Sequence, residues 1–139
     1  MKKDSSLIAT LRSQGHRMTA AREALLRILE GSDRPLSVEE LRLLLDQMRL
    51  RVNKTTIYRE LVFLKSQHVL REIELGDERK RYELVSDKAH HHHMVCDNCK
   101  SIEDVVVDEA LERRLMPQPR SFRVNNHLLE FFGLCEQCQ

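Results

Sequence analysis

All four cysteines of the 139-residue sequence stand in two Cys-x-x-Cys pairs, Cys96 with Cys99 and Cys135 with Cys138. Each pair can place two thiolates on one metal ion through a tight turn, and two pairs complete the tetrahedral sulfur shell that Zn²⁺ prefers. Two disulfides or a redox pair are the alternatives, but no thioredoxin-like βαβ pattern surrounds either pair, and we expect a cytoplasmic chain. The spacing therefore predicts one structural zinc ion on these four thiolates.

A run of four histidines precedes the first cysteine pair: His90, His91, His92 and His93. On a strand, alternate residues point to opposite faces, so His90 and His92 can serve one metal site while His91 and His93 serve another. Imidazole suits Zn, Fe, Mn, Ni or Cu, and its pKa near neutrality makes binding reversible. A solvated loop is the alternative. The side chains that could complete the two sites are Glu83, Asp104, Asp108, Glu109, Glu112 and His127.

The elements expected around these residues are strands over 100–107 and 121–132 and a short helix over 108–115. The end of the second strand is unusually apolar for a sheet of this size, with Leu128, Leu129, Phe131, Phe132 and Leu134. An exposed apolar face of this kind predicts a protein interface, and we expect the chain to dimerise through it.

The pattern of apolar residues in the first half of the sequence predicts four helices, over 5–14, 19–31, 37–48 and from residue 53 onward. The third has a capping box, Ser37 with Glu40, and the fourth begins after Asn53. Two strands over 69–75 and 79–85, joined through Gly76 and Asp77, then predict a hairpin. Helices followed by a hairpin is the order of a winged helix-turn-helix. The expected fold class is α+β: this winged domain, then a small α/β dimerisation domain with the four-cysteine zinc site.

The fourth helix predicts a DNA-reading surface. Its buried stripe is Ile57, Leu61 and Leu64, which leaves a polar, basic face outward. In a winged helix the last helix enters the major groove and its neighbours touch phosphates. A helical bundle with an ordinary solvated basic face is the alternative, because many winged helices serve only protein contacts.

Charge divides the chain in the same way. The net charge is +1 overall, but residues 1–85 hold 17 Lys and Arg against 13 Asp and Glu, whereas residues 86–139 hold 6 against 9. We predict two domains, 1–86 for DNA and 87–139 for metal and dimerisation. No apolar run is long enough to span a bilayer, and the start of the sequence does not resemble a signal peptide, so we expect a cytoplasmic protein without a membrane partner.

The sequence closely resembles the ferric uptake regulator family of bacterial repressors over nearly its whole length. The likeness rests on Arg17-Met18-Thr19 with Arg22, on Thr55-Thr56-Ile57-Tyr58-Arg59, and on the histidine run and both cysteine pairs. It implies a homodimer that binds a palindromic operator in double-stranded DNA when a divalent metal closes the two domains. The DNA contacts implied are Arg17, Lys54, Thr55, Thr56, Tyr58 and Arg59, with Arg17 near the minor groove.

The resemblance also implies two metal sites beside the structural zinc. The regulatory set is Glu83, His91, His93 and Asp104, and the second set is His90, His92, Glu112 and His127, with Asp108 and Glu109 as alternative acids. Ferrous iron and zinc are the expected regulatory metals, and manganese is possible. A peroxide-sensing repressor of the same family is the alternative, since Asp104 looks like the carboxylate of those sensors.

The chain departs from the family where a histidine usually precedes the third helix, because Arg34-Pro35-Leu36-Ser37 contains none. Lys100 also replaces the glycine usual after the first cysteine pair. A zinc hydrolase using Glu83 or Glu103 as base is the rival from another class, but no H-x-E or H-E-x-x-H motif occurs. A metal-storage module without DNA binding is a second rival. We expect a regulator and no enzyme.

Overall fold

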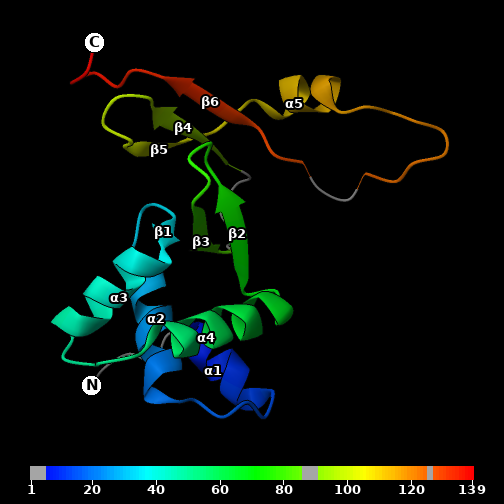
Figure 1. The fold of residues 1–139 in the computed structure, drawn as a ribbon. Coiled ribbons are helices and arrows are strands. Elements are labelled where there is room, and N and C mark those ends of the chain that lie inside the picture. The colour runs from blue at the N-terminus through cyan, green and yellow to red at the C-terminus, as the bar shows by residue number, and fades with distance from the viewer. Residues whose placement is uncertain (1–5, 86–90, 125–126) are drawn as a thin grey trace. The chain divides into compact units, whose positions relative to one another are not determined.

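The computed structural model describes residues 6–85, 91–124 and 127–139, which fall into two units that divide between Ser86 and Asp87. The first unit holds four helices and three strands (Figure 1). The helices are α1 (Ser6–Ser13), α2 (Ala20–Glu30), α3 (Val38–Gln47) and α4 (Lys54–Ser66). The strands are β1 (Leu36–Ser37), β2 (Leu70–Glu74) and β3 (Lys80–Leu84).

Three of these helices begin where the sequence offers a capping side chain. The Thr19 hydroxyl accepts a hydrogen bond from the backbone N–H of Arg22 at the start of α2. Ser37 and Glu40 form the predicted capping box of α3, in which each side chain accepts from the other residue's backbone N–H. The Asn53 side chain accepts from Thr56 at 2.8 Å and starts α4. These caps satisfy backbone donors that a helix start otherwise leaves unpaired.

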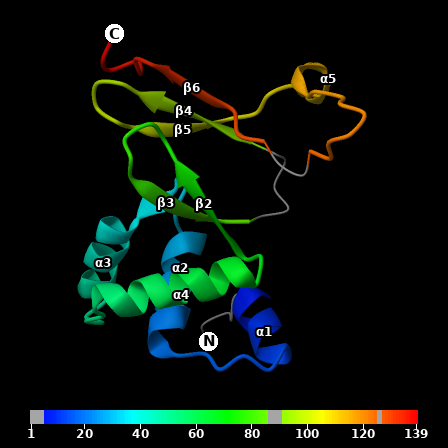
Figure 2. The same cartoon turned by 45° about the vertical axis from the view of Figure 1, so that its right-hand side comes forward.

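The core of the first unit lies between the helices and one face of the hairpin. α2 packs against α1, α3 and α4, and Figure 2 shows α4 crossing the bundle beside α2. The predicted stripe of α4, Ile57, Leu61 and Leu64, is buried as expected. Each fully buried Leu or Ile stabilises the fold by about 1.5–3 kcal/mol relative to an exposed one. The outer face of α4 is thereby fixed toward solvent.

The hairpin forms a three-stranded sheet in the order β1-β3-β2. The two-residue strand β1, which the sequence did not predict, pairs with β3 through Leu36 and Tyr82. The turn between β2 and β3 is closed by Arg81, which donates two hydrogen bonds to Asp77 at 2.7 and 2.6 Å. This pair lowers the pKa of Asp77 to about 2. The hairpin is thus the wing of a winged helix.

The second unit is a small sheet with one helix. β4 (His92–Cys96) lies between β5 (Ile102–Val105) and β6 (Glu130–Gly133), and the helix is α5 (Glu109–Leu115). β4 pairs antiparallel with β5 and parallel with β6. In both views α5 lies beyond the end of the sheet where β4 and β6 begin (Figures 1 and 2).

The prediction of a strand over 121–132 was largely wrong. Only β6 at its end is a strand, and residues 121–124 and 127–129 are in neither helix nor strand. Alternating apolar residues suit a strand only where a partner strand is available, and the parallel register with β4 begins at Glu130. The apolar side chains at and after this strand remain exposed: Phe131 44%, Phe132 51% and Leu134 52%. Among the described residues, no helix has the length and apolar character needed to cross a bilayer.

Candidate metal centres and nucleic-acid interface

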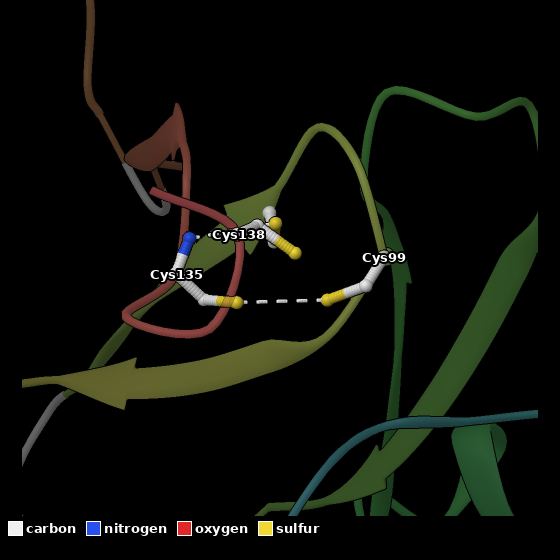
Figure 3. A group of neighbouring side chains, drawn as sticks. Cys99, Cys135 and Cys138 are labelled. Carbon is white, nitrogen blue, oxygen red and sulfur yellow. Dashed lines mark hydrogen bonds between the residues drawn. The ribbon is translucent and has the colours of Figure 1, made fainter.

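The four cysteines come together because β4 and β6 run parallel. Cys96 ends β4 and Cys135 follows β6, and the register pairs Cys96 with Gly133, so both cysteine pairs lie at the same end of the sheet. The four sulfur atoms all lie within 4.8 Å of one another. Figure 3 shows Cys99 and Cys135 facing each other, with Sγ atoms 3.7 Å apart, and Cys138 turned toward them. The arrangement is a compact set of four sulfur donors, and all four thiols are free.

The electrostatics of this cluster favour a bound cation. Backbone N–H groups of Cys135, Cys99 and Asn98 lower the pKa of Cys96 to about 6 despite its burial. The Asn98 side chain also lowers the pKa of Cys138, but contacts with the other thiols and burial outweigh it and raise that pKa to about 11. Four crowded sulfur atoms therefore cannot all carry charge by themselves. A soft divalent cation between them removes the repulsion, and the donor set fits Zn²⁺.

A second donor cluster joins β4 to α5. Glu112 Oε1 lies 3.2 Å from His92 Nε2 and 2.5 Å from His127 Nε2. The three residues offer ligand atoms within 4.8 Å of one another, and the His92 side chain is only 3% exposed. Two imidazoles and one carboxylate suit zinc, iron or manganese. His90, which we predicted for this set, lies outside the described residues.

The two alternative acids of the second set, Asp108 and Glu109, have other partners than the histidines. Asp108 caps α5 and accepts from the backbone N–H of Leu111. Glu109 pairs with Arg113 on the open surface, where both side chains are at least 80% exposed. Glu112, by contrast, contacts both His92 and His127.

The remaining predicted donors in the second unit are His93 on β4, Asp104 on β5 and His91, which directly precedes β4. His93 pairs in register with Asp104, and their Nε2 and Oδ1 atoms are 3.6 Å apart. The rings of His91 and His93 meet edge to face, with centroids 5.3 Å apart. Glu83, the fourth predicted member, belongs to β3 of the first unit, where the Arg71 side chain donates to its carboxylate at 2.5 Å.

One carboxylate beside this set was not predicted from the sequence. Glu130 on β6 stands opposite His93 in the parallel register. Within the described part of the chain its Oε1 is buried without a hydrogen-bond partner, and burial raises the pKa of the side chain. The position of Glu130 beside His93 follows only from the β4–β6 register. In the sequence the two residues are 37 positions apart, and Glu130 stands in a mostly apolar stretch.

Residues 34–37, the stretch that lacks the expected histidine, all have structural roles in the first unit. Arg34 donates to Glu40 at 2.6 Å, and Pro35 is among the most buried side chains. Leu36 is buried and Ser37 caps α3. No side chain of these four residues is available as a metal ligand.

The outer face of α4 carries the predicted DNA contacts. Lys54, Thr55, Tyr58 and Arg59 are exposed, and Thr56 is half-buried. The Lys54 ammonium pairs with Glu39 of α3 at 2.7 Å, and both side chains are more than half exposed. An exposed ion pair contributes little, so Lys54 can exchange Glu39 for another anion.

A largely buried arginine joins this face to the loop that carries Arg17, a structural role that the sequence did not predict. Arg22 Nε donates to Glu60 of α4 at 2.7 Å, and the two side chains are only 13% and 12% exposed. Arg22 also donates to the backbone carbonyl of the exposed Arg17 and stacks over Phe63, 3.7 Å from the ring centroid. The loop that carries Arg17 is therefore held against α4 by the Arg22 guanidinium and by His16, whose ring meets Phe63 edge to face.

Comparison with known proteins agrees with these features. The Ferric uptake regulator family model matches residues 13–132. The Ferric uptake regulation protein of Bacillus subtilis (strain 168) is 32% identical over 133 residues, which cover 92% of this chain and 89% of that one. The Peroxide-responsive repressor PerR of Staphylococcus aureus (strain USA300) is 31% identical over 133 residues, with 95% and 88% covered.

Solved structures have the same fold. A zinc-bound manganese uptake regulator superposes with a TM-score of 0.76 at 28% identity, covering 94% of this chain and 99% of that one. The ferric uptake regulator Fur of Helicobacter pylori, whose structure reveals three functional metal binding sites, gives a TM-score of 0.75 at 23% identity, with 99% and 97% covered.

Proposed function

The chain belongs to the ferric uptake regulator family of metal-responsive transcriptional regulators, and we propose that it is a homodimeric repressor of metal uptake or homeostasis genes. Residues 1–86 bind a palindromic operator in double-stranded DNA, and residues 87–139 bind metal and form the dimer. The observation that carries the proposal is the family match over residues 13–132, which spans both the exposed face of α4 and most of the metal-donor groups.

The four thiolates of Cys96, Cys99, Cys135 and Cys138 hold the structural zinc ion. The cluster joins the end of β4 to the end of the chain, so the zinc stabilises a unit too small for a large core. The Phe131, Phe132 and Leu134 side chains, about half exposed in one subunit, form part of the dimer interface.

The regulatory donors are Glu83, His91, His93 and Asp104, and the second set is His90, His92, Glu112 and His127. A bound divalent cation supplies positive charge that holds these donors together. Glu83 is the contribution of the first unit and the other three regulatory donors come from the second. A metal can shift the DNA-binding equilibrium only through its different affinity for the two states, so a site shared by both units can regulate.

On DNA, α4 enters the major groove. Tyr58 and Arg59 reach base edges, while Lys54, Thr55 and Thr56 lie at the start of the helix near the backbone. Arg17 approaches the minor groove from a loop that Arg22 fixes to α4. The protein acts in the cytoplasm, where its operator is, and it has no catalytic role.

Ferrous iron and zinc are the metals that the donor sets favour, with manganese a third candidate. A peroxide-sensing repressor is the second candidate function, because Asp104 places a carboxylate 3.6 Å from His93 and peroxide-responsive relatives match the chain. Hydrogen peroxide should release DNA from the ferrous protein but not from the manganese protein if this alternative holds.

The test begins with the protein purified from its own host. We expect one zinc per subunit that survives mild chelation, a dimer by light scattering, and a palindromic duplex when the protein selects from a random DNA pool. A monomer that retains no zinc and selects no duplex would refute the proposal.

A further inference from the structure

An open hollow lies on the first unit between α3 and the start of α4. Its volume is about 1080 Å³, and it is lined by Arg42, Asp46, Arg49, Arg51, Val52 and Asn53. Three of these six residues are arginines and one is acidic, so the lining carries a net positive charge. All three arginines are exposed.

These arginines lack the internal partners that several other arginines of the first unit have. Arg22, Arg34 and Arg81 each donate to a carboxylate of their own unit. Within the part of the chain that the structure describes, no side-chain hydrogen bond or ion pair is made by any of the lining arginines: Arg42, Arg49 and Arg51. Like charges around one hollow repel each other, and an anion between them removes that repulsion.

We propose that Arg42, Arg49 and Arg51 form a pocket for a DNA backbone phosphate next to the major groove. This inference rests on the proposed function. The guanidinium group matches a phosphate through paired N–H donors, which is a stronger match than an ammonium group offers. The hollow also includes Asn53, the residue that caps α4, so the positive end of the helix dipole lies at the pocket.

The position of the pocket on the helix identifies the phosphate as one of DNA. α4 begins at Lys54 and carries Tyr58 and Arg59 one turn further on. When such a helix enters the groove with its N-terminal end, the elements that flank this end meet the sugar-phosphate backbone. The nearby Lys54 already has Glu39 as an anionic partner at 2.7 Å. Lys54 has to exchange this partner to bind a phosphate, whereas the arginines of the hollow have none to give up among the described residues.

The test is the salt dependence of DNA binding. The variant Arg42→Gln/Arg49→Gln/Arg51→Gln is compared with the unchanged protein on its selected duplex and on a random duplex. Removing the cations that neutralise one phosphate makes the slope of log affinity against log salt shallower by about 0.9, so we expect a change of about 0.9 for each bound subunit. Both duplexes should bind more weakly by the same factor, because backbone contacts carry no sequence information.

A matched control removes the same charge elsewhere. Arg114, Arg120 and Arg123 are exposed on the second unit, and their triple glutamine variant should keep the slope of the unchanged protein. An equal change of slope in both triple variants would show an effect of net charge and overturn the pocket. An unchanged slope in the first variant, or weaker binding confined to the selected duplex, would also overturn it. If the unchanged protein binds no duplex at all, the proposed function fails together with the pocket.

One further variant separates binding from folding. Arg49 follows α3 with φ +58°, and the backbone N–H of Leu50 donates to Leu45 at 3.0 Å to close the helix. Glycine suits this left-handed position better than arginine. Arg49→Gly should keep or raise the melting temperature and still make the salt slope shallower, by up to about 0.9 per subunit. An unchanged slope in this stable variant would exclude Arg49 from the pocket.

Discussion

Arg22→Ala should strongly destabilise the first unit although the residue lies outside the apolar core. The change removes the partner of Glu60, whose side chain is 12% exposed, and leaves its carboxylate nearly buried. Breaking a fully buried ion pair from one side costs about 3–5 kcal/mol. Because both groups retain some contact with water, we take about 3 kcal/mol for this pair.

The same substitution removes the stacking of the guanidinium on Phe63, where the centroid distance is 3.7 Å. A partly desolvated cation–π contact contributes about 1 kcal/mol. The expected total is about 4 kcal/mol, a large share of the roughly 5–15 kcal/mol that a folded domain has. Glu60→Gln keeps a hydrogen-bond acceptor for Arg22, so its expected cost is only about 1 kcal/mol.

The assay is urea unfolding followed by tyrosine fluorescence. The sequence has no tryptophan, and its two tyrosines, Tyr58 and Tyr82, both belong to the first unit. The signal therefore reports this unit alone. Arg27→Ala on the same helix is the control, since Arg27 and Glu23 are a surface pair with side chains 27% and 33% exposed. An Arg22→Ala cost no larger than that of Arg27→Ala would refute the reasoning.

Three further predictions concern the zinc cluster, the DNA face and the wing. Cys138→Ser should unfold the second unit and abolish the dimer, and a folded zinc-free dimer of this variant would contradict the structural assignment. Arg59→Ala should weaken operator binding by about 1–3 kcal/mol and relax base preference. Lys54→Ala should instead weaken binding to all DNA alike and make the salt slope shallower by about one. If Arg59→Ala weakens binding to the operator and to random DNA equally, Arg59 does not read a base. Arg81 lowers the pKa of Asp77 to about 2, below the value near 3.9 of an unfolded chain. The Asp77–Arg81 pair therefore stabilises the folded first unit fully above pH about 4, and this stabilisation is lost as the pH falls through 2. Asp77→Asn should flatten that acid-induced decrease in tyrosine-monitored unfolding, and an unaltered pH profile would show that the pair contributes nothing.

Local signals in the sequence were sufficient for much of the first unit. Capping depends on residues three positions apart, so Ser37 with Glu40 and Asn53 could be identified without any tertiary information. The buried stripe of α4 follows from helical periodicity alone. The pairing of Arg22 with Glu60 could not be found in this way, because 38 residues separate them and only the packing of α2 on α4 brings them together.

The second unit depends more on long-range register. The cysteine spacing predicted a shared metal, but the parallel pairing of β4 with β6 is what brings the two pairs together. The same register places Glu130 beside His93, which no local pattern indicates. The choice of Glu112 among three acids required the position of α5 relative to His92. Apolar alternation over 121–132 misled the strand prediction, since periodicity does not reveal whether a partner strand is present.

Metal-dependent operator binding tests the central claim most directly. The full-length protein is freed of exchangeable metal, and its affinity for the selected duplex is measured by anisotropy while ferrous iron, manganese and zinc are titrated separately. We predict that one of these metals strengthens binding by about tenfold, or about 1.4 kcal/mol, which is a modest coupling because Glu83 is the only member of the proposed regulatory set from the first unit. The double variant His91→Ala/His93→Ala should lose this enhancement and keep the cysteine-bound zinc. Operator binding that is equally strong with and without every metal, or an undiminished metal response in the double variant, would contradict the account.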